Sequence, residues 1–578
     1  MTTTSRRPPL PVLGQRAASA PAPAIARDPS APRVRLVTLG CDKNTVDSER
    51  QLGRLMGAGA RLVGEAESAD VVVINTCGFI DAAREESVDA ILDAVRLKEA
   101  GSIRAVVAMG CLVQRYKEEL ETELPEVDLF IRLTEAEQLV PQLRARGVLP
   151  PADAVSTMER PLRVLSTRTR HTSYLKISEG CDHGCAFCAI PLMRGKHRST
   201  PIDALVREAQ QLSAAGVVEL NVISQDTTWY GRDLLRGNAP AEGDLFVGRV
   251  FPRMAGSAAD GSNHGHGAAP GNGAATGHGA ATGSQAATGI PAVSPGPRPG
   301  PTAPARRSIS NPISNSRRGL LPDLLTALLE QTDVPWLRLF YMYPSGISRE
   351  LVELMAREQR IVPYLDMPIQ HGADAVLTRM RRPERQATIR ERVSWLREAI
   401  PDLSLRTTLI IGFPGETEDD LEELLELLEE VRFDHLGAFP YSVEEGTPAA
   451  TMPERVPDSA VRERLERLFE LQRSITMERN ERWIGREATV LVDSLVGRDS
   501  GMDAATETDA ATDHAGDIHV NGRGAVGRTV GQALEIDGVV HIGDSGDAQP
   551  GEFVRVRIDD VLDDDLIGTR TDGGEGGA

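Results

Sequence analysis

Three short apolar runs each lead to a cysteine, and this recurrence constrains the fold of the N-terminal part of the chain. The runs cover residues 34–39, 71–74 and 105–109, and they lead to Cys41, Cys77 and Cys111. Runs of Val and Ile bounded by polar residues or Gly are typical of buried parallel strands. Helical patterns lie between them, at about 46–57, 81–98 and 113–122. This alternation predicts an open α/β sheet domain over residues 33–150.

The position of these cysteines indicates a ligand site. Ligands of open parallel sheets bind outside the carboxyl ends of the strands. Each cysteine follows such an end, so we expect the fold to bring Cys41, Cys77 and Cys111 together along one edge. The alternative is three unrelated buried cysteines, since free Cys is often a core residue. Recurrence at the same structural place, about 35 residues apart, favours a shared thiolate site.

A second set of cysteines lies within eight residues, at Cys181, Cys185 and Cys188. Thiolates select iron–sulfur clusters or zinc over hard cations. Three thiolates on a cubic four-iron cluster leave one iron open to a substrate or cofactor. A structural zinc site needs four protein ligands, and His183 or His197 could supply the fourth. The spacing favours a cluster and leaves zinc as the alternative.

Repeated strand–helix units predict a second domain over residues 165–484. Candidate strands lie at 173–177, 217–223, 336–343, 361–369, 403–412 and 434–440. The pattern predicts a full or partial parallel barrel, with its cluster at the carboxyl face of the first strand. Residues 255–318 contain no Leu and no aromatic residue, so they cannot bury a core. We therefore expect a disordered insertion over about residues 239–318.

Two polar segments close predicted strands of this domain. One is Ser224-Gln225-Asp226, and the other is Gly412-Phe413-Pro414-Gly415-Glu416. Polar groups at a strand end suit ligand contact, and glycines allow close backbone approach. Each segment is equally well a turn followed by a helix cap, and Thr417 with Asp420 resembles a capping box.

The pattern of the C-terminal part, residues 485–568, predicts a small β-barrel. Strand-like runs lie at 490–492, 525–529, 539–542 and 553–558, separated by Gly-rich turns. Residues 485–578 hold 7 Arg and Lys against 20 Asp and Glu, partly in an acidic loop at about 499–517. This negative net charge disfavours nonspecific RNA binding, whereas an acidic face can attract a basic protein. The net charge of −20 for the whole chain agrees with a basic partner.

Length and composition set the remaining bounds. A chain of 578 residues has room for two to four domains. Residues 1–32 are rich in Arg, Ser, Ala and Pro, and we expect a disordered tail. The sequence shows neither an apolar run long enough to span a membrane nor a signal peptide, so we expect a cytoplasmic protein. Six cysteines are too few and too unevenly placed for a disulfide scaffold.

The motifs together resemble one family. The second cysteine set, with Phe187 before its last cysteine, resembles the radical S-adenosylmethionine (SAM) motif. Leu39-Gly40-Cys41-Asp42-Lys43-Asn44, Asn75-Thr76-Cys77-Gly78-Phe79 and Met109-Gly110-Cys111 resemble the N-terminal domain of methylthiotransferases. The C-terminal barrel is similar to a TRAM domain. The order of the three parts is that of radical SAM methylthiotransferases.

Within that family, the chain resembles the branch that modifies an aspartate of small-subunit ribosomal protein twelve. The resemblance covers residues 180–198, Ser224 to Asp233, Tyr343 to Gly346 and Tyr364 to Gly372. The alternative branch modifies a tRNA adenosine beside the anticodon, and it usually carries Gln-Met-Asn where this chain has Asp42-Lys43-Asn44. A nucleic acid is therefore disfavoured as the substrate.

The resemblance implies two [4Fe-4S] clusters with separate roles. Cys181, Cys185 and Cys188 would hold the cluster that binds and cleaves SAM, yielding a radical that takes hydrogen from the aspartate β-carbon. Cys41, Cys77 and Cys111 would hold the cluster that carries the sulfur, and a second SAM would supply the methyl group. An electron donor such as flavodoxin or ferredoxin is implied. The expected SAM-pocket residues are Phe187, Ser224, Gln225, Asp226, Gln370, Gly412, Gly415 and Glu416.

Overall fold

The computed structural model describes residues 31–64, 66, 68–152, 162–166, 169–235, 319–496 and 524–572. The predicted insertion and acidic loop lie outside these residues, as does the predicted tail except for residues 31 and 32. Within the described ranges, no helix is both long and apolar enough to cross a membrane.

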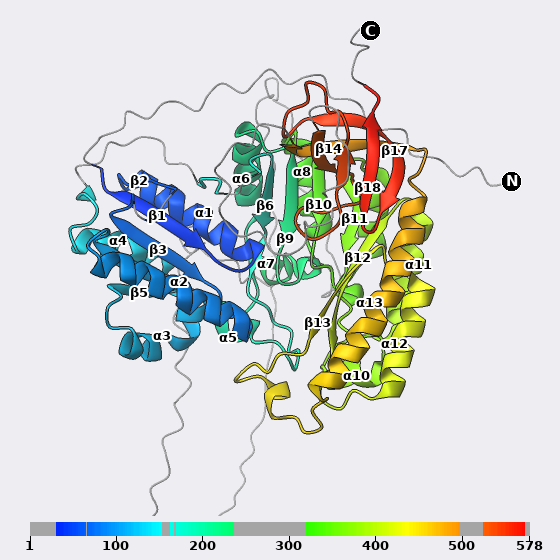
Figure 1. Cartoon of the computed structure of the whole chain (residues 1–578), viewed down its shortest axis with the longest axis horizontal. Helices are drawn as coiled ribbons and strands as arrows, with labels where there is room; N and C mark the ends of the chain where they lie inside the picture. Colours follow the sequence, from blue (N-terminus) through cyan, green and yellow to red (C-terminus); the bar gives the residue numbers. More distant parts are fainter. Residues whose placement is uncertain are drawn as a thin grey trace, which may run out of the picture. The chain divides into compact units, whose positions relative to one another are not determined.

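The first domain is an open parallel α/β sheet, as the alternating pattern predicts (Figure 1). Its strands are β1 (Arg33–Thr38), β2 (Arg61–Leu62), β3 (Val71–Thr76), β4 (Ala105–Gly110) and β5 (Leu129–Arg132), in the order β2-β1-β3-β4-β5. Its helices are α1 (Asp42–Gly57), α2 (Asp81–Glu99), α3 (Cys111–Glu123), the 3-10 turn η1 (Leu133–Gln138) and α4 (Leu139–Ala145). Apolar residues of α1 and α4 pack on one face of the sheet, and those of α2 and α3 pack on the other. Both faces are therefore buried, which explains the continuous apolar runs.

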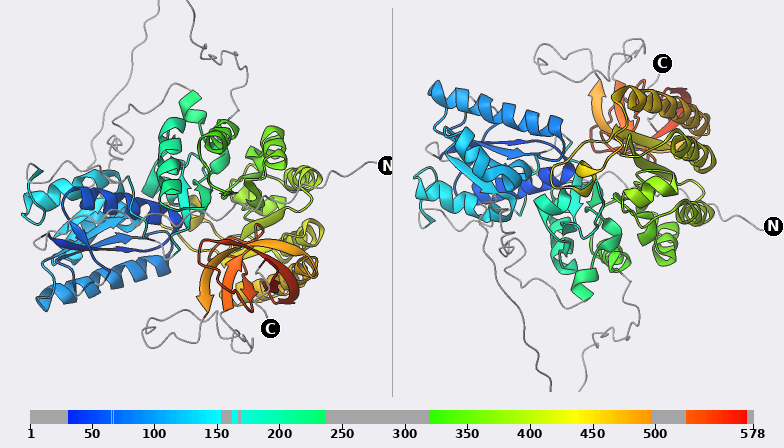
Figure 2. Two further views of the ribbon diagram at one scale, coloured as in Figure 1. Left: turned by 90° about the horizontal axis from the view of Figure 1, so that it is seen from above. Right: turned by 90° about the horizontal axis from the view of Figure 1, so that it is seen from below.

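The second domain is a six-stranded parallel sheet, a partial barrel with β6 and β13 at its edges. Its strands are β6 (Thr172–Lys176), β9 (Glu219–Ile223), β10 (Trp336–Leu339), β11 (Ile361–Asp366), β12 (Ser404–Ile411) and β13 (His435–Pro440). Its larger helices are α6 (Ile202–Ala214), α8 (Leu321–Gln331), α9 (Arg349–Arg357), α10 (Asp374–Arg379), α11 (Gln386–Ala399), α12 (Glu418–Val431) and α13 (Asp458–Glu481). They pack on one side of the sheet, which forms the largest core cluster (Figure 2).

Short elements of this domain surround the second cysteine set. They are β7 (Ser178–Glu179), α5 (Ile190–Arg194), β8 (Arg198–Ser199), η3 (Thr227–Trp229), α7 (Arg232–Leu235), η4 (Pro344–Gly346) and η5 (Pro448–Thr451). β9 and β10 are hydrogen-bonded neighbours although residues 224–335, which include the undescribed stretch 236–318, separate them in sequence. The chain on either side of that stretch meets, because the Leu320 N–H donates to the Tyr230 carbonyl at 2.8 Å.

The third domain is a small closed barrel of β14 (Glu487–Val496), β15 (Gly524–Arg528), β16 (Val540–Ile542), β17 (Phe553–Leu562) and β18 (Asp565–Arg570), as predicted for the C-terminal part. The sequence analysis missed β18. That strand begins at Asp565, the last of three consecutive aspartates, and buries only alternate residues, so it lacks a clear apolar run.

The closed barrel docks on the face of the six-stranded sheet that the helices leave open. Leu491, Ala533 and Phe553 pack there against side chains such as Trp336 and Tyr364.

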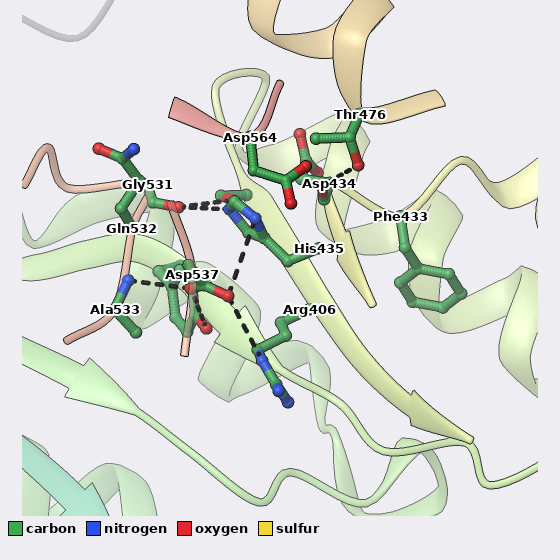
Figure 3. Close-up of polar contacts among 12 residues, drawn as sticks. Arg406, Phe433, Asp434, His435, Thr476, Gly531, Gln532, Ala533, Asp537 and Asp564 are labelled. Carbon is green, nitrogen blue, oxygen red and sulfur yellow. Dashed lines mark hydrogen bonds and ion pairs between the residues drawn. The ribbon is translucent and has the colours of Figure 1, made fainter. Parts of the chain in front are cut away.

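A polar cluster at the same seam is shown in Figure 3. His435 Nε2 lies 2.9 Å from the Gly531 carbonyl, and Asp537 accepts hydrogen bonds from the Tyr364 hydroxyl at 2.8 Å and the Ala533 N–H at 2.9 Å. Arg406 Nε lies 3.4 Å from the same carboxylate. The third domain is therefore fixed to the second by buried polar contacts as well as by apolar ones.

Candidate cluster and cofactor site

The first cysteine set gathers at one edge of the N-terminal sheet. Cys41 precedes α1, Cys77 follows β3, and Cys111 begins α3 directly after β4. Since β1, β3 and β4 are adjacent and parallel, their carboxyl ends share this edge. The three cysteines therefore lie at the same edge of the sheet, and their role as ligands of one cluster stays a prediction.

Glycines allow these cysteine loops to approach closely. A Cβ atom on Gly40 would stand 2.7 Å from the sulfur of Cys77, and one on Gly78 would stand 2.9 Å from the Leu112 backbone, next to Cys111. Gly40 also has a positive φ of 85°, which L side chains rarely adopt. A side chain at either glycine would push the cysteine loops apart.

Asn44 ties the three loops together. Its Nδ2 donates to the Leu39 carbonyl at 2.8 Å and to the Thr76 carbonyl at 3.1 Å, and these residues lead into Cys41 and Cys77. Its Oδ1 lies 3.7 Å from Cys111 Sγ. Asn44 belongs to a motif of the first cysteine set, but the motif alone predicts no role for it. The sequence signal that could have identified Asn44 is its position, because an amide side chain stands three residues after the cysteine that follows a predicted strand.

The second cysteine set occupies the loop after β6 and β7. The Cys181 N–H donates to the Gly195 carbonyl at 3.0 Å, and the Cys188 N–H donates to the Cys185 carbonyl at 3.2 Å. Cys185 Sγ lies 3.8 Å from the Tyr343 hydroxyl. These contacts fold the loop so that its three cysteines lie at the carboxyl end of the first barrel strand, where the pattern predicted them.

A cation lies against this loop. Arg382 Nη1 is 4.0 Å from Cys185 Sγ, and its guanidinium stands 3.9 Å from the centre of the Tyr343 ring. Arg382 also pairs with Glu384 at 3.1 Å, and both side chains are fully buried. A buried positive charge beside three thiolates offsets part of their negative charge. Neither Arg382 nor Tyr343 was assigned a role from the sequence.

Burial dominates the acid–base properties of the cysteines. It raises the pKa of Cys111, Cys181 and Cys188 to about 12, and it raises the pKa of Cys77 as well. Without a metal these thiols are neutral at pH 7. Metal binding at either set must therefore displace protons.

The candidate zinc ligands have other partners. His183 Nε2 lies 2.7 Å from Asp226 Oδ2, and its ring stacks on Tyr343 with centroids 4.3 Å apart. His197 Nε2 lies 3.1 Å from Ser199 Oγ. Within the part of the chain that the structure describes, no group of three or more His, Cys, Asp or Glu residues is arranged to hold a single metal ion. Three thiolates without a fourth protein ligand would instead suit an iron–sulfur cluster, whose ligands are cysteine thiolates.

Some of the expected SAM-pocket residues lie around the second set. Phe187 packs with Phe413, Met380 and Ala449, which brings the cysteine loop against the end of β12. Ser224 contacts the Ser178 hydroxyl, and Asp226 caps η3 by accepting from the Thr228 N–H at 2.9 Å. Gln225 follows Ser224 and is half-buried.

The others lie at the ends of β11 and β12. Gln370 has a positive φ of 70°, which is strained for a residue with a side chain, and its backbone pairs with Thr408 and Ile410. Gly412 and Gly415 form the turn after β12, with positive φ angles of 82° and 77°.

Glu416 holds the turn after β12. Its Oε2 accepts hydrogen bonds from the Gly412 and Phe413 N–H groups at 2.8 and 3.1 Å, and its Oε1 pairs with Arg464 at 2.7 Å. Burial alone would raise the pKa of Glu416, but His371 and Arg464 hold it below its ordinary value. Both carboxylate oxygens are engaged within the protein.

The short helix α5 links the second cysteine set to the first. This helix begins two residues after Cys188, and its Met193 packs with Ala189 directly against Cys111. One short helix therefore adjoins both cysteine sets, which belong to separate domains.

A second link comes from the loop after β13. Glu444 in this loop pairs with Arg84 at 2.7 Å and with Arg115 at 3.3 Å, and both arginines belong to the first domain.

Family models match all three parts of the chain. Residues 33–132 match an uncharacterized protein family, UPF0004, residues 317–428 match the radical SAM superfamily, and residues 513–570 match the TRAM domain. Among solved structures, the radical SAM methyltransferase TsrM from Kitasatospora setae, with cobalamin and a [4Fe-4S] cluster bound, aligns with a TM-score of 0.42 at 12% identity. The alignment covers 73% of this chain and 77% of that chain.

Curated relatives match nearly the full length. The chain is 40% identical to the ribosomal protein uS12 methylthiotransferase RimO of Anaeromyxobacter sp. (strain Fw109-5), over 93% of this chain and 92% of the relative. It is 38% identical to RimO of Myxococcus xanthus, over 92% and 90% of the two chains. It is 36% identical to RimO of Geobacter sulfurreducens, over 93% and 98%.

Proposed function

The chain belongs to the RimO family of ribosomal protein uS12 methylthiotransferases, and we propose that it transfers a methylthio group to the β-carbon of a uS12 aspartate. This is the small-subunit ribosomal protein that the sequence analysis expects as the substrate. The relatives carry the name of the protein-modifying branch, so the tRNA alternative is not favoured. The enzyme is a radical SAM methylthiotransferase.

The observation that carries the proposal is that α5, which follows the second cysteine set directly in sequence, packs on Cys111 of the first set. Three thiolates fit a [4Fe-4S] cluster that keeps one iron free. We assign one cluster to Cys181, Cys185 and Cys188 and a second to Cys41, Cys77 and Cys111. The first would supply reductive cleavage of SAM, and the second would carry the sulfur that is transferred.

The chain's own residues bind, orient and shield these groups. Phe187 and Phe413 supply an apolar wall beside the second set, and the turn at Gly412 presents backbone close to it. The strained backbone of Gln370 places its side chain at the end of β11. Arg382 supplies a fixed positive charge beside Cys185. Ser224, Gln225, Asp226, Gly415 and Glu416 complete the proposed pocket, with Glu416 acting through the turn that it holds.

The proposed activity also implies a cellular location, an electron donor and a class of substrate. An enzyme that modifies a ribosomal protein acts where ribosomes are assembled, so we place it in the cytoplasm. A small electron-transfer protein such as flavodoxin or ferredoxin would reduce the cluster. The excess of acidic residues in the third domain supports a basic protein substrate over a nucleic acid.

The test is an anaerobic reconstitution followed by incubation with SAM, reductant and either uS12 or tRNA. Mass spectrometry should find the methylthio group on an aspartate of uS12 and none on tRNA. A Cys185→Ala variant should lose SAM cleavage. A Cys77→Ala variant should keep SAM cleavage and lose sulfur transfer. Normal sulfur transfer by Cys77→Ala would refute the division of labour, and methylthiolated tRNA would establish the alternative substrate.

A further inference from the structure

Arg194 is a buried arginine at the junction of the two cysteine sets. It is the last residue of α5, six residues after Cys188, and only 3% of its surface is exposed. Its guanidinium donates to Asn44 Oδ1 at 2.6 Å, to Glu179 Oε1 at 2.8 Å and to Asp47 Oδ2 at 3.1 Å. Asn44 and Asp47 belong to α1 of the first domain, whereas Glu179 precedes Cys181 in the second.

The contact with Asn44 reaches every loop of the first cysteine set. Asn44 uses its amide N–H groups for the backbone before Cys41 and Cys77, and its amide oxygen lies near both Cys111 Sγ and Arg194. One side chain therefore spans the three loops, and Arg194 fixes that side chain. A shift of α5 would be transmitted to all three cysteine loops through a single amide.

Two carboxylates hold the guanidinium in this orientation. Asp47 and Glu179 both bind Arg194, and both also contact Lys176 at the end of β6. Two cations and two anions form a closed, largely desolvated network across the domain boundary. Such a network has one favourable arrangement, because displacing any member leaves an unpaired buried charge.

The positive charge also acts on the first cysteine set. Its guanidinium lies 2.6 Å from Asn44 Oδ1, and the same oxygen lies 3.7 Å from Cys111 Sγ, so the charge stands one amide group away from this cysteine. The same guanidinium interacts electrostatically with Cys41. The reduction potential of an iron–sulfur cluster depends on nearby charge, on hydrogen bonds and on exposure to solvent.

We propose that Arg194 is a positioning residue that holds the two cysteine sets in register and places a permanent positive charge beside the first set. The inference rests on the proposed function, since it concerns how the sulfur-carrying site is aligned with the site of SAM cleavage. Arg194 contacts neither set of cysteines by a hydrogen bond. It acts through Asn44, the carboxylates and its charge.

The first experiment isolates the charge. In a full-length Cys181→Ala/Cys185→Ala/Cys188→Ala background, only the first set can assemble a cluster, of about four irons per chain. Adding Arg194→Met should leave the iron content unchanged and shift the midpoint potential of that cluster to a lower value. Adding Arg194→Lys instead should restore most of the potential, because the charge is kept.

The second experiment tests the alignment of the two cysteine sets separately from the charge. In the otherwise native chain, Arg194→Met and Arg194→Lys should still cleave SAM, while methylthio-uS12 formed per 5′-deoxyadenosine falls by about ten- to a hundred-fold. The lysine cannot replace the three-way planar contact, so it should rescue the potential but not this ratio. The matched control is Arg50→Met. That residue of α1 also crosses the domain boundary, to Glu208 at 2.9 Å.

The outcomes separate the two proposals. If Arg194→Met and Arg50→Met give the same product ratio, and if Arg194→Met leaves the potential unchanged, the role of Arg194 is refuted. If the native enzyme cleaves SAM without modifying uS12, the proposed function fails, yet the potential measurement still tests the charge of Arg194. If Arg194→Met does not assemble the first cluster, the test uses Arg194→Lys instead. A native midpoint potential together with a native yield of methylthio-uS12 per 5′-deoxyadenosine in that variant would refute the inference.

Discussion

A Cβ atom on Gly40 would lie 2.7 Å from the sulfur of Cys77, so two loops of the first cysteine set approach as closely as a glycine allows. This contact joins residues that are far apart in sequence. It makes the geometry of the set sensitive to a single methyl group.

Gly40→Ala should therefore damage the first cysteine set and spare the second. We expect the iron content of the reconstituted protein to fall from about eight to about four per chain, with SAM cleavage retained. The control is Gly101→Ala. Gly101 has a similar positive φ of 76° but no atom within 4 Å of its added Cβ, so it shares the backbone strain without the collision. Equal iron contents in both variants would show that the close contact has no consequence.

Glu444 should act as a clamp between the loop after β13 and the first domain. Its carboxylate is 3% exposed and bridges Arg84 and Arg115. Glu444→Ala leaves two guanidinium groups without this partner and should lower the free energy of unfolding by about 3 kcal/mol. Hydrogen exchange of residues 441–447 should become faster. The adjacent, exposed Glu445→Ala is the control, and identical exchange in the two variants would contradict the clamp.

The raised thiol pKa values predict a loss of stability at alkaline pH in the metal-free protein. The pKa of Cys111, Cys181 and Cys188 is about 12 in the fold, above the ordinary value of about 8.5 for a free thiol. The folded state therefore holds these protons more tightly than the unfolded state does. Their contribution is complete below about pH 8.5 and is lost as the pH rises toward 12.

This pH dependence can be measured by thermal unfolding of the metal-free chain between pH 8 and pH 11. The decrease in melting temperature should be smaller in a Cys181→Ala/Cys188→Ala variant, which lacks two of the three groups. The cluster-loaded protein should not show this contribution, because metal binding has already displaced the protons. An unchanged pH profile in the variant would refute the assignment to these thiols.

Asp537 should fix the third domain to the second. It accepts hydrogen bonds from Tyr364 and Ala533, and it lies within 3.7 Å of His435 Nδ1 (Figure 3). Asp537→Ala should cost about 3 kcal/mol, because Tyr364 and Arg406 lose a buried anionic partner. The exposed Asp544→Ala, in the same domain, should cost less than about 0.5 kcal/mol. Chemical denaturation measures both, and equal stability would exclude a docking role.

The sequence predicted the elements best where local pattern and burial agree. The strand-end positions of Cys41, Cys77 and Cys111 followed from continuous apolar runs, which two covered sheet faces require. The partial barrel followed from repeated strand–helix units. β18 was missed because it has only two large apolar residues, Leu566 and Ile567, and because it begins at the end of an acidic run.

The interior of the site could not be predicted in the same way. Arg194 and Asn44 are 150 residues apart, and neither carries a local signal of the other. Glu416 was expected beside the cofactor, but its two oxygens hold the turn after β12 and Arg464. Sequence spacing identifies candidate ligands, whereas the orientation of the side chains around them depends on which domains pack together.

The meeting of Tyr230 and Leu320 has a practical consequence for engineering. Because the Leu320 N–H donates to the Tyr230 carbonyl, the described chain on either side of residues 236–318 lies close together, and a short Gly–Ser bridge in their place should leave the register of β9 and β10 unchanged. The entropic free-energy cost of closing a loop changes by only about 0.6 kcal/mol for each doubling of the loop length. A reporter domain or an affinity tag inserted at the same place should therefore leave both strands in position.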